Sequence, residues 1–376
     1  MRTKLLLVVN EPWFFVSHRL PIAIAAMSLG YEVHLATNAG SEVEGIERVG
    51  IVVHEIPFTR SSTAPLAEIR TLIALYKLYK KIRPDMVHHV TIKPVLYGSF
   101  IAQISRVPNI VNAISGLGFV FLATGLIARL RRLIVKIAYR FTFRKPNVIA
   151  IFQNPDDKEL FLSSGLLNES QTYLIKGSGV DLSKFDVVDE PVGVKTVVLA
   201  ARMLWDKGVG EFVDAARVLK KRGVNARFCL LGDIDSGNPK AISREQIDVW
   251  CSSGMVEWHG FSDNINDVFS KSHIVCLPSY REGLPKVLME AAACGRAVIT
   301  TDVPGCRHAI KPDVTGFLVP VKNSSILAKT LEKLILDSEL RVQMGKAGRK
   351  LAEEEFDINK VIEQHLNIYS LDISSI

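Results

Sequence analysis

The chain has 376 residues, too many for one compact core, so two domains are expected, each able to bury a substantial interior. Its 48% hydrophobic and 23% charged residues are the composition of an ordinary soluble globular protein. The five cysteines are an odd number and have no metal-type spacing to histidine, which argues against a disulfide scaffold and favours reduced, buried thiols in the cytoplasm.

The net charge of +7 is unevenly distributed along the chain. Residues 1–185 hold 22 basic and 13 acidic side chains, a balance of +9, whereas the remainder holds 24 and 26, a balance of −2. No acid lies between Asp85 and Asp156, although nine basic residues do. A positive surface of this kind suits anionic lipid, nucleic acid or a phosphorylated substrate.

The first half of the chain alternates short β-branched runs with helical segments. The first run ends at Asn10, too early for a secretory leader, and is interpreted as a strand. Helices are expected at about residues 17–29 and 65–82. Further strands are expected in YEVHLAT, GIVVHEI, DMVHHV and NIVNAI. Alternation of this kind predicts a mainly parallel sheet with helices on both faces.

Residues 107–128 carry no charge and are numerous enough to span a bilayer. Because this run contains one proline and three glycines, a strand, a glycine turn and the start of a helix are favoured over a spanning helix.

The following segment, LIARLRRLIVKIAYRFTFRK, has helical periodicity in two kinds of residue. Apolar side chains recur on one face, and basic ones on another, namely Arg129, Arg132, Lys136 and Arg140. Two interpretations stay open: an ordinary helix whose apolar face covers its own sheet, and a basic amphipathic helix that lies on an anionic membrane.

The second half repeats the alternation, with strands expected in KTVVLAA, ARFCLLG, VEWHG, HIVCLPS, AVITT and GFLVP. A polar stretch between the halves marks the boundary. The fold class predicted is therefore α/β, with two doubly wound domains, residues 1–190 and 191–355, followed by a terminal helix within 356–376.

Two cations follow the first strand of the second domain. Arg202 and Lys207 lie in ARMLWDKG, at the carboxyl end of that strand, where ligands bind in open α/β sheets. A solvated loop is the ordinary alternative for such a pair.

The stretch REGLPKVLMEAAACG contains a glycine turn followed by a helix. Gly283 lets the backbone approach a ligand, and Pro285 suits a helix start, where N–H groups and the helix dipole favour phosphate. Glu290 falls inside the apolar helix, so its carboxylate requires specific donors such as two ribose hydroxyls. Glu282 would then face the other end of a nucleotide-sugar.

These motifs together resemble the retaining nucleotide-sugar glycosyltransferases of GT-B type, family 4, over essentially the whole chain. The resemblance rests on the two glutamates within PSYREGLPKVLMEAAACGRAVITTDVPG and on ARMLWDKG, RPDMVHHV and LLGD. Within that family, the chain is similar to bacterial enzymes that add N-acetylhexosamine to undecaprenyl-diphosphate-linked sugars.

The resemblance implies two Rossmann-like domains that face a central cleft, with the terminal helix packed back on the first domain. It implies that Arg202 and Lys207 hold the donor diphosphate, and that Glu290 binds ribose while Glu282 faces the sugar. Backbone amides around Gly283, Leu284 and Pro285 would complete the phosphate site. No metal or other cofactor is expected, because the cations neutralise the leaving diphosphate.

The chain departs from the family in the first domain, where many members carry a histidine beside the donor sugar. NIVNAISGLG has no histidine, so His18 and Arg19 are the candidates for contact near the acceptor. The expected enzyme transfers hexose or N-acetylhexosamine from a UDP-sugar to a polyprenyl-diphosphate-linked saccharide, at the cytoplasmic face of the inner membrane. A GT-B enzyme with a soluble acceptor and an epimerase are the alternatives. A nucleic-acid partner is not expected, because the chain has no recognisable nucleic-acid-binding motif.

Overall fold

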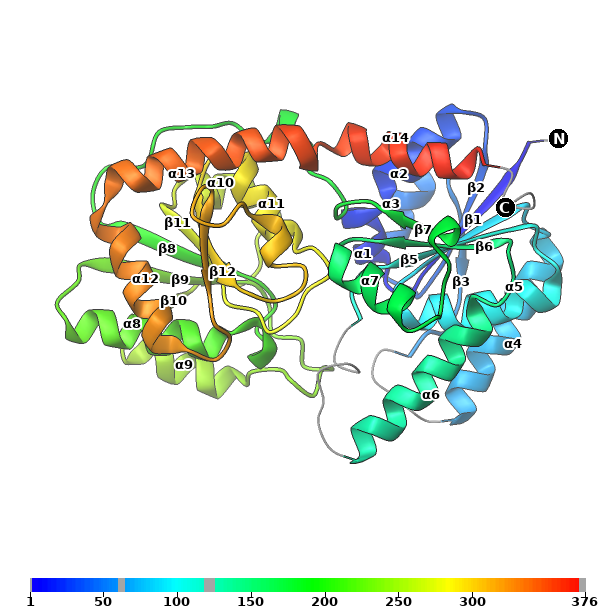
Figure 1. The fold of residues 1–376 in the computed structure, drawn as a ribbon, viewed down its shortest axis with the longest axis horizontal. Coiled ribbons are helices and arrows are strands. Elements are labelled where there is room, and N and C mark those ends of the chain that lie inside the picture. Colours follow the sequence, from blue (N-terminus) through cyan, green and yellow to red (C-terminus); the bar gives the residue numbers. More distant parts are fainter. Residues whose placement is uncertain (1, 60–64, 118–125, 372–376) are drawn as a thin grey trace. The chain divides into compact units, whose positions relative to one another are not determined.

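The computed structural model describes residues 2–59, 65–117 and 126–371, without the side chains of 65 and 126–132. The chain forms two compact units, Met1–Ser178 with Asn359–Ile376, and Gly179–Ile358. Each unit is built on one parallel sheet (Figure 1).

The sheet of the first unit has seven strands in the order β3-β2-β1-β4-β5-β6-β7. The strands are β1 (Lys4–Val9), β2 (Glu32–Thr37), β3 (Val52–Glu55), β4 (Met86–Val90), β5 (Asn109–Ile114), β6 (Val148–Phe152) and β7 (Thr172–Leu174). Strands β4 and β6 are buried along their whole length, and β1, β2 and β5 are buried after their first residue, as is usual for parallel strands covered on both faces.

Helices cover both faces of this sheet, and each face has its own apolar core. Figure 1 shows α4, α5 and α6 on one side and α2 and α14 on the other. The helices are α1 (Pro12–His18), α2 (Leu20–Ser28), α3 (Val43–Arg48), α4 (Pro65–Ile82), the π-helix η1 (Pro94–Gly98), α5 (Ser99–Ser105), α6 (Leu126–Thr142), α7 (Pro155–Ser163), the short η3 (Glu169–Gln171) and α14 (Ile358–Tyr369).

The sheet of the second unit has six parallel strands in the order β10-β9-β8-β11-β12-β13. They are β8 (Lys195–Ala200), β9 (Ala226–Leu231), β10 (Glu257–Trp258), β11 (Ile274–Leu277), β12 (Ala297–Thr301) and β13 (Gly316–Val319). Strand order reverses between β8 and β11, so the loops after these two strands diverge at that point, the usual ligand position in such sheets.

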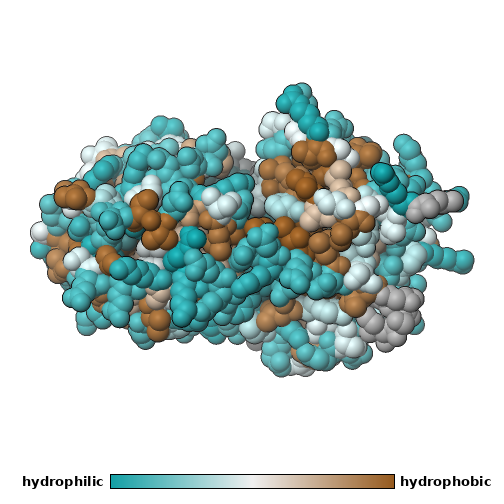
Figure 2. Space-filling view, turned by 90° about the horizontal axis from the view of Figure 1, so that it is seen from above, coloured by the Kyte–Doolittle hydropathy of each residue, from teal (hydrophilic) through white to brown (hydrophobic). Residues whose placement is uncertain are grey.

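The helices of the second unit also lie on both faces of their sheet. Helices α8, α9 and α12 share one core, and α10, α11 and the end of α13 share the other (Figure 1). Their bounds are η4 (Leu182–Lys184), η5 (Trp205–Lys207), α8 (Val209–Lys221), α9 (Arg244–Ser252), α10 (Ile265–Ser270), α11 (Lys286–Ala293), η6 (Arg307–Ala309), α12 (Ser324–Leu336), α13 (Ser338–Leu351) and the π-helix η7 (Ala352–Phe356). On the face drawn in Figure 2, hydrophilic residues cover most of the surface.

The segment 179–190, assigned from the sequence to the first domain, packs with the second unit in the structure. Val180 pairs with the backbone around Phe356, its N–H donating to the Phe356 carbonyl at 2.7 Å. Glu190 accepts two hydrogen bonds, at 2.7 and 2.6 Å, from the buried guanidinium of Arg341 in α13. Because of these contacts, residues 179–190 belong to the second unit, although their polar composition suggested a linker.

Removing the Glu190 carboxylate is expected to destabilise the second unit by about 3–5 kcal/mol, because Arg341 would keep a buried charge without its counterion. Glu190→Ala should therefore show a lower free energy of unfolding in urea. Asp189→Ala, one residue away at an exposed position, is the control and should change it by less than about 0.5 kcal/mol. Equal unfolding curves for the two variants would contradict the role of Glu190 as the counterion of Arg341.

One local expectation in the first unit was wrong, and two strands were missed. The helix expected over residues 17–29 is two helices, α1 and α2, because the backbone at Arg19 leaves the helical region with φ −133°. Pro21, at the second position of α2, suits a new helix start there. Strands β6 and β7 were not foreseen, since both follow the basic helix and β7 has three residues.

The terminal helix packs on the first unit. In α14, Tyr369 is buried, and its hydroxyl lies 2.5 Å from Nδ1 of His88 on β4. Tyr31 donates a hydrogen bond to the Tyr369 carbonyl at 3.2 Å. The return of the chain end to the first sheet is therefore fixed by side chains at opposite ends of the sequence.

Candidate active site

Charged side chains gather in the second unit where β8 and β11 end. These strands pair, with Ile274 opposite Val197, so their carboxyl ends lie at one edge of the sheet. The loop after β8 carries Arg202 and continues into η5, which contains Lys207, and the loop after β11 carries Glu282. Residues far apart in sequence are thereby brought together as the sequence analysis expected.

Lys207 and Glu282 form the central contact of this site. The Lys207 ammonium donates to Oε1 of Glu282 at 2.5 Å, and both side chains are largely buried, 19% and 13% exposed. The buried Ser279 hydroxyl donates to the same oxygen at 2.7 Å. The pair therefore sits in a partly dry position where electrostatic interactions are stronger than in water.

The backbone fixes the position of Lys207. Gly208 has φ +74°, and a Cβ at that position would overlap the carbonyl group of Pro278. The Asp206 carbonyl accepts a hydrogen bond from the Tyr280 N–H at 2.9 Å and lies 3.2 Å from Ser279 Oγ. Glycine is required for this close approach of the two loops. The contact between these two loops therefore fixes the backbone that carries the Lys207 ammonium.

Arg202 lies at the more open side of the site. Its side chain is 45% exposed, and its Nη1 donates to Oδ2 of Asp235 at 2.6 Å. Asp235 is nearly buried at 8% exposed and follows the end of β9. This carboxylate orients the guanidinium while leaving much of it accessible to an anion.

The turn before α11 directly follows Glu282, the ion-pair partner of Lys207. Gly283, Leu284 and Pro285 are buried, and Pro285 occupies the N-cap position of α11, where its side chain offers no acceptor to the first N–H groups. A Cβ on Gly305 would overlap the backbone of Glu282 and Gly283, so a second loop holds this turn in place. The positive end of the α11 dipole thus adds to the charges of the side chains.

Glu290 lies in the middle of α11, as the sequence predicted, with a side chain only 13% exposed. The Lys286 ammonium is 3.4 Å from its carboxylate, one turn earlier on the helix. Burial raises the pKa of Glu290 above its ordinary value, and Lys286 opposes that shift. A group that donates hydrogen bonds to this carboxylate would favour its charged form.

Sequence reasoning missed three polar residues of the site: Asp206, Asp235 and Ser279. Burial raises the pKa of Asp206, with Glu282 adding to the shift and Lys207 opposing it. Ser279 and Asp235 both follow the carboxyl end of a strand, and that position was the available signal. Their roles depend on side-chain partners that spacing alone does not identify.

The two candidates in the first unit behave differently from expectation. Arg19 is 1% exposed and its guanidinium donates to the neighbouring His18 carbonyl at 2.9 Å. Burial lowers the pKa of Arg19 to about 10. Arg19 therefore lies inside the first unit, and its contact with an acceptor stays a prediction. His18 is half-buried and stacks on the Phe14 ring with centroids 4.0 Å apart.

Helix α6 has an exposed apolar face. Leu133, Ile134, Ile137 and Phe141 are 54%, 58%, 55% and 60% exposed, while Tyr139 is among the residues that face the sheet. The interpretation in which those apolar residues cover the sheet is therefore wrong.

The basic residues of α6 are described in part. Lys136 and Arg140 are exposed, and the side chains of Arg129 and Arg132 lie outside the described residues. No helix in the described ranges is long and apolar enough to cross a bilayer.

One group of potential metal ligands is present among the described residues, and it lies on β9 and in and after β10. Cys229, Glu257 and His259 have ligand atoms within 4.8 Å of one another. Glu257 also accepts two hydrogen bonds from Arg227, at 2.9 and 2.5 Å, so a cation would have to displace that arginine. None of these side chains belongs to the site after β8 and β11.

Two family models match the chain along most of its length. The model for Glycosyl transferases group 1 matches residues 182–351, which include the site, and the model for Glycosyl transferase 4-like matches residues 4–151. The chain is a glycosyltransferase. The expected family and enzyme class are thereby confirmed.

Two curated relatives match this glycosyltransferase over most of its length. It is 28% identical over 375 residues to the N,N'-diacetylbacillosaminyl-diphospho-undecaprenol alpha-1,3-N-acetylgalactosaminyltransferase of Campylobacter jejuni, covering 95% of this chain and 96% of that protein. It is 24% identical over 330 residues to the UDP-Gal:alpha-D-GlcNAc-diphosphoundecaprenol alpha-1,3-galactosyltransferase of Escherichia coli, covering 84% and 82%.

Solved structures share the fold of this glycosyltransferase. Anabaena Alr3699/HepE in complex with UDP and glucose superposes with a TM-score of 0.76 at 19% identity, covering 98% of this chain and 100% of that chain. The glycosyltransferase from Rickettsia africae gives 0.77 at 19% identity, covering 100% of both. The predicted GT-B class, with two Rossmann-like domains, is confirmed.

Proposed function

We propose that this glycosyltransferase moves a hexose or N-acetylhexosamine, with retention of anomeric configuration, from a UDP-sugar such as UDP-GalNAc or UDP-GlcNAc to a polyprenyl-diphosphate-linked saccharide. The Lys207–Glu282 pair beside the start of α11 carries the proposal for the donor, because it joins cation, carboxylate and backbone amides in one partly buried site. The names of these two relatives both describe an acceptor linked to undecaprenyl diphosphate, which supports the acceptor class.

The donor diphosphate would lie between Arg202, Lys207 and the turn at Gly283, Leu284 and Pro285. The positive charge of the two side chains and of the α11 dipole complements two phosphates. Arg202 is exposed enough to receive an oxygen without leaving Asp235.

Glu290 would accept hydrogen bonds from the ribose hydroxyls, and Glu282 would face the donor sugar. The turn at the start of α11 separates the two glutamates, so a nucleotide-sugar would place its ends on either side of that turn. Ser279 and Lys207 both hydrogen-bond to Glu282 and would keep its carboxylate oriented.

Transfer breaks the bond between the anomeric carbon and the diphosphate oxygen, which takes the electron pair. Lys207 and Arg202 would stabilise the charge that develops there, a role that a divalent metal fills in other enzymes. The acceptor oxygen forms the new bond to the anomeric carbon and its hydroxyl proton is released. We propose that these cations suffice without a metal or another cofactor.

The enzyme would act as a peripheral protein at the cytoplasmic face of the inner membrane. Support comes from α6, whose exposed apolar residues lie beside exposed Lys136 and Arg140. Helices of this composition bind anionic bilayers through apolar insertion and charge attraction. Arg129 and Arg132 would join that contact.

The donor assignment is tested by a screen of UDP-, GDP- and ADP-sugars for thermal stabilisation and slow hydrolysis. The correct donor at about 100 times its Kd should stabilise the protein by about 2.7 kcal/mol. Glu282→Ala should lose hydrolysis, whereas Glu339→Ala, at an exposed position of α13, should keep it. If no nucleotide-sugar shifts the melting temperature, the proposed site is not a donor site.

A further inference from the structure

Helices α4 and α5 expose apolar side chains much as α6 does. On α4, Ile69, Ile73 and Tyr76 follow a helical spacing and are 50%, 49% and 40% exposed. On α5, Phe100 and Ile104 are each 49% exposed. Contiguous apolar surface of this kind on a soluble protein usually marks an interaction site.

The three helices lie next to one another over the same face of the sheet (Figure 1). Tyr79 of α4, Ile101 of α5 and Tyr139 of α6 all enter one core, so the opposite sides of these helices point outward together. Gln103 of α5 donates to the carbonyl of Thr142 in α6 at 2.8 Å, which fixes the two helices side by side. We call the exposed apolar side chains of α4, α5 and α6 the three-helix face.

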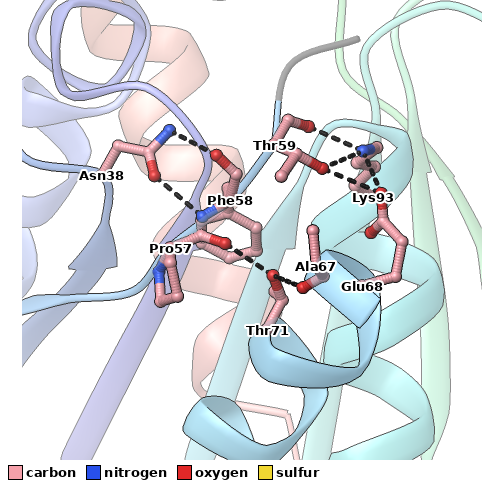
Figure 3. A network of polar contacts seen from close by, with 8 residues as sticks. All are labelled: Asn38, Pro57, Phe58, Thr59, Ala67, Glu68, Thr71 and Lys93. Carbon is pink, nitrogen blue, oxygen red and sulfur yellow. Dashed lines mark hydrogen bonds and ion pairs between the residues drawn. The ribbon is translucent and has the colours of Figure 1, made fainter. Parts of the chain in front are cut away.

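Positive charge surrounds the three-helix face. Lys77, Lys80 and Lys81 are exposed on α4, and Arg106 is exposed just after α5. The one acid of α4, Glu68, is only 17% exposed and is bound by the Lys93 ammonium at 2.7 Å (Figure 3). An anionic partner would therefore meet little repulsion from carboxylates.

A pocket of about 530 Å³ opens beside the three-helix face at the end of α6. Apolar side chains line part of it, including Ile137, Phe141 and Leu166. Arg140 and Arg144 also line it, together with the neutral polar residues Asn168 and Gln171. Within the described part of the chain, neither arginine has an acidic ion-pair partner. A phosphate that carries an acyl chain fits this combination of cations and apolar walls.

We propose that the three-helix face and this pocket form one docking surface for an anionic phospholipid bilayer. The apolar side chains of α4 and α5 enter the bilayer together with those of α6, and a lipid headgroup phosphate occupies the pocket between Arg140 and Arg144. The basic rim identifies the partner, because a second copy of this chain would bring like charges against one another. The surface deepens the proposed membrane location, on which it rests, by assigning contact to two helices beyond α6.

The contribution of α4 and α5 is tested by sedimentation with vesicles of phosphatidylcholine containing phosphatidylglycerol. The double variant Ile73→Glu/Phe100→Glu should bind these vesicles about tenfold or more weakly than the wild type, because two apolar side chains no longer enter the bilayer. The matched control Ile24→Glu/Val249→Glu adds the same charge at exposed apolar positions of α2 and α9 and should bind within about twofold of the wild type.

The headgroup pocket has its own test. Arg144→Ala should reduce the preference for phosphatidylglycerol over pure phosphatidylcholine vesicles severalfold, while Lys145→Ala, the adjacent exposed cation outside the pocket lining, should reduce it less. Equal loss in both variants would overturn the pocket assignment.

Further outcomes distinguish a failure of the docking surface from a failure of the proposed function. Unchanged vesicle binding by Ile73→Glu/Phe100→Glu would overturn the three-helix face, as would a wild-type dimer that this variant converts to a monomer in size-exclusion chromatography. Thermal stabilisation by the nucleotide-sugar should persist in the variant, because its substitutions lie in the first unit. If vesicle binding follows the prediction but no sugar reaches a lipid-linked acceptor, the docking surface stands and the proposed function fails.

Discussion

Replacing Lys207 with alanine is expected to lower the rate of sugar transfer at saturating donor by about 10²–10³-fold, the usual effect of removing one preorganised group that stabilises a developing anion. Lys207 is held by the η5 turn and by Glu282, so its charge needs little reorganisation when the diphosphate leaves. A neutral side chain would also leave the largely buried Glu282 without its cation. Initial rates over a range of donor concentrations would separate kcat from KM.

The exposed Lys221 at the end of α8 supplies the matched control, and Lys221→Ala should transfer sugar at the wild-type rate. Lys207→Arg should fall between the two, because charge is kept while the compact ammonium geometry is lost. A Lys207→Ala enzyme within about threefold of the wild-type kcat would contradict the role proposed for this cation.

Glu290→Gln is expected to weaken donor binding by about 10- to 100-fold with a smaller change in kcat, since hydrogen bonds to a charged group contribute about 1.5–3 kcal/mol. The ribose is remote from the bond that breaks, so the loss should appear mainly in the Kd and KM for the nucleotide-sugar. Isothermal titration calorimetry with the donor measures this directly. Glu339→Gln on α13 is exposed and should leave the Kd unchanged.

The same residue predicts a pH dependence. Burial raises the pKa of Glu290 in the folded protein, so the folded state holds more protons than the unfolded state between the ordinary and the raised value. The stability of the ligand-free protein should therefore fall as pH rises through that interval, and Glu290→Gln should remove this fall. Ribose hydroxyls favour the charged carboxylate, so donor binding should release protons in the same interval. For the binding experiment described above, equal donor Kd values for the wild type and Glu290→Gln would exclude a contact between Glu290 and the ribose.

Much of the fold was accessible from the sequence because parallel strands buried on both faces are continuous apolar runs. All six strands of the second unit and five of the first were foreseen, although the edge strands β3 and β10 are not fully buried. The break at Arg19 was not, because it depends on a single backbone conformation within an otherwise helical segment. The very short β7 carries too few residues for a pattern.

The site was predictable to the extent that its residues follow strand ends. Arg202, Lys207 and Glu282 could be assigned to one sheet edge from their positions alone, and Glu290 to the interior of a helix. The side chain that each of these residues contacts was not predictable. The contact of Arg202 with Asp235, for example, depends on how the loops after β8 and β9 fold, and spacing does not determine this.

The orientation of α6 shows a further limit. Its sequence has an apolar face and a basic face, and either could point away from the sheet. The structure turns Tyr139 into the core, where it packs against Phe143 and Phe161, and this leaves the aliphatic face exposed. Aromatic packing decided a question that periodicity left open.

The most direct test of the proposed function is the mass of the product. In one reaction, the wild-type protein is incubated with phosphatidylglycerol-containing vesicles that carry an undecaprenyl-diphosphate-linked saccharide, together with the donor that stabilises the protein. A parallel reaction contains a soluble saccharide of the same sequence as the acceptor. The proposal predicts that the lipid-linked acceptor gains the mass of one or more donor sugars, and that Glu282→Ala abolishes this gain. Transfer to the soluble saccharide alone would contradict it.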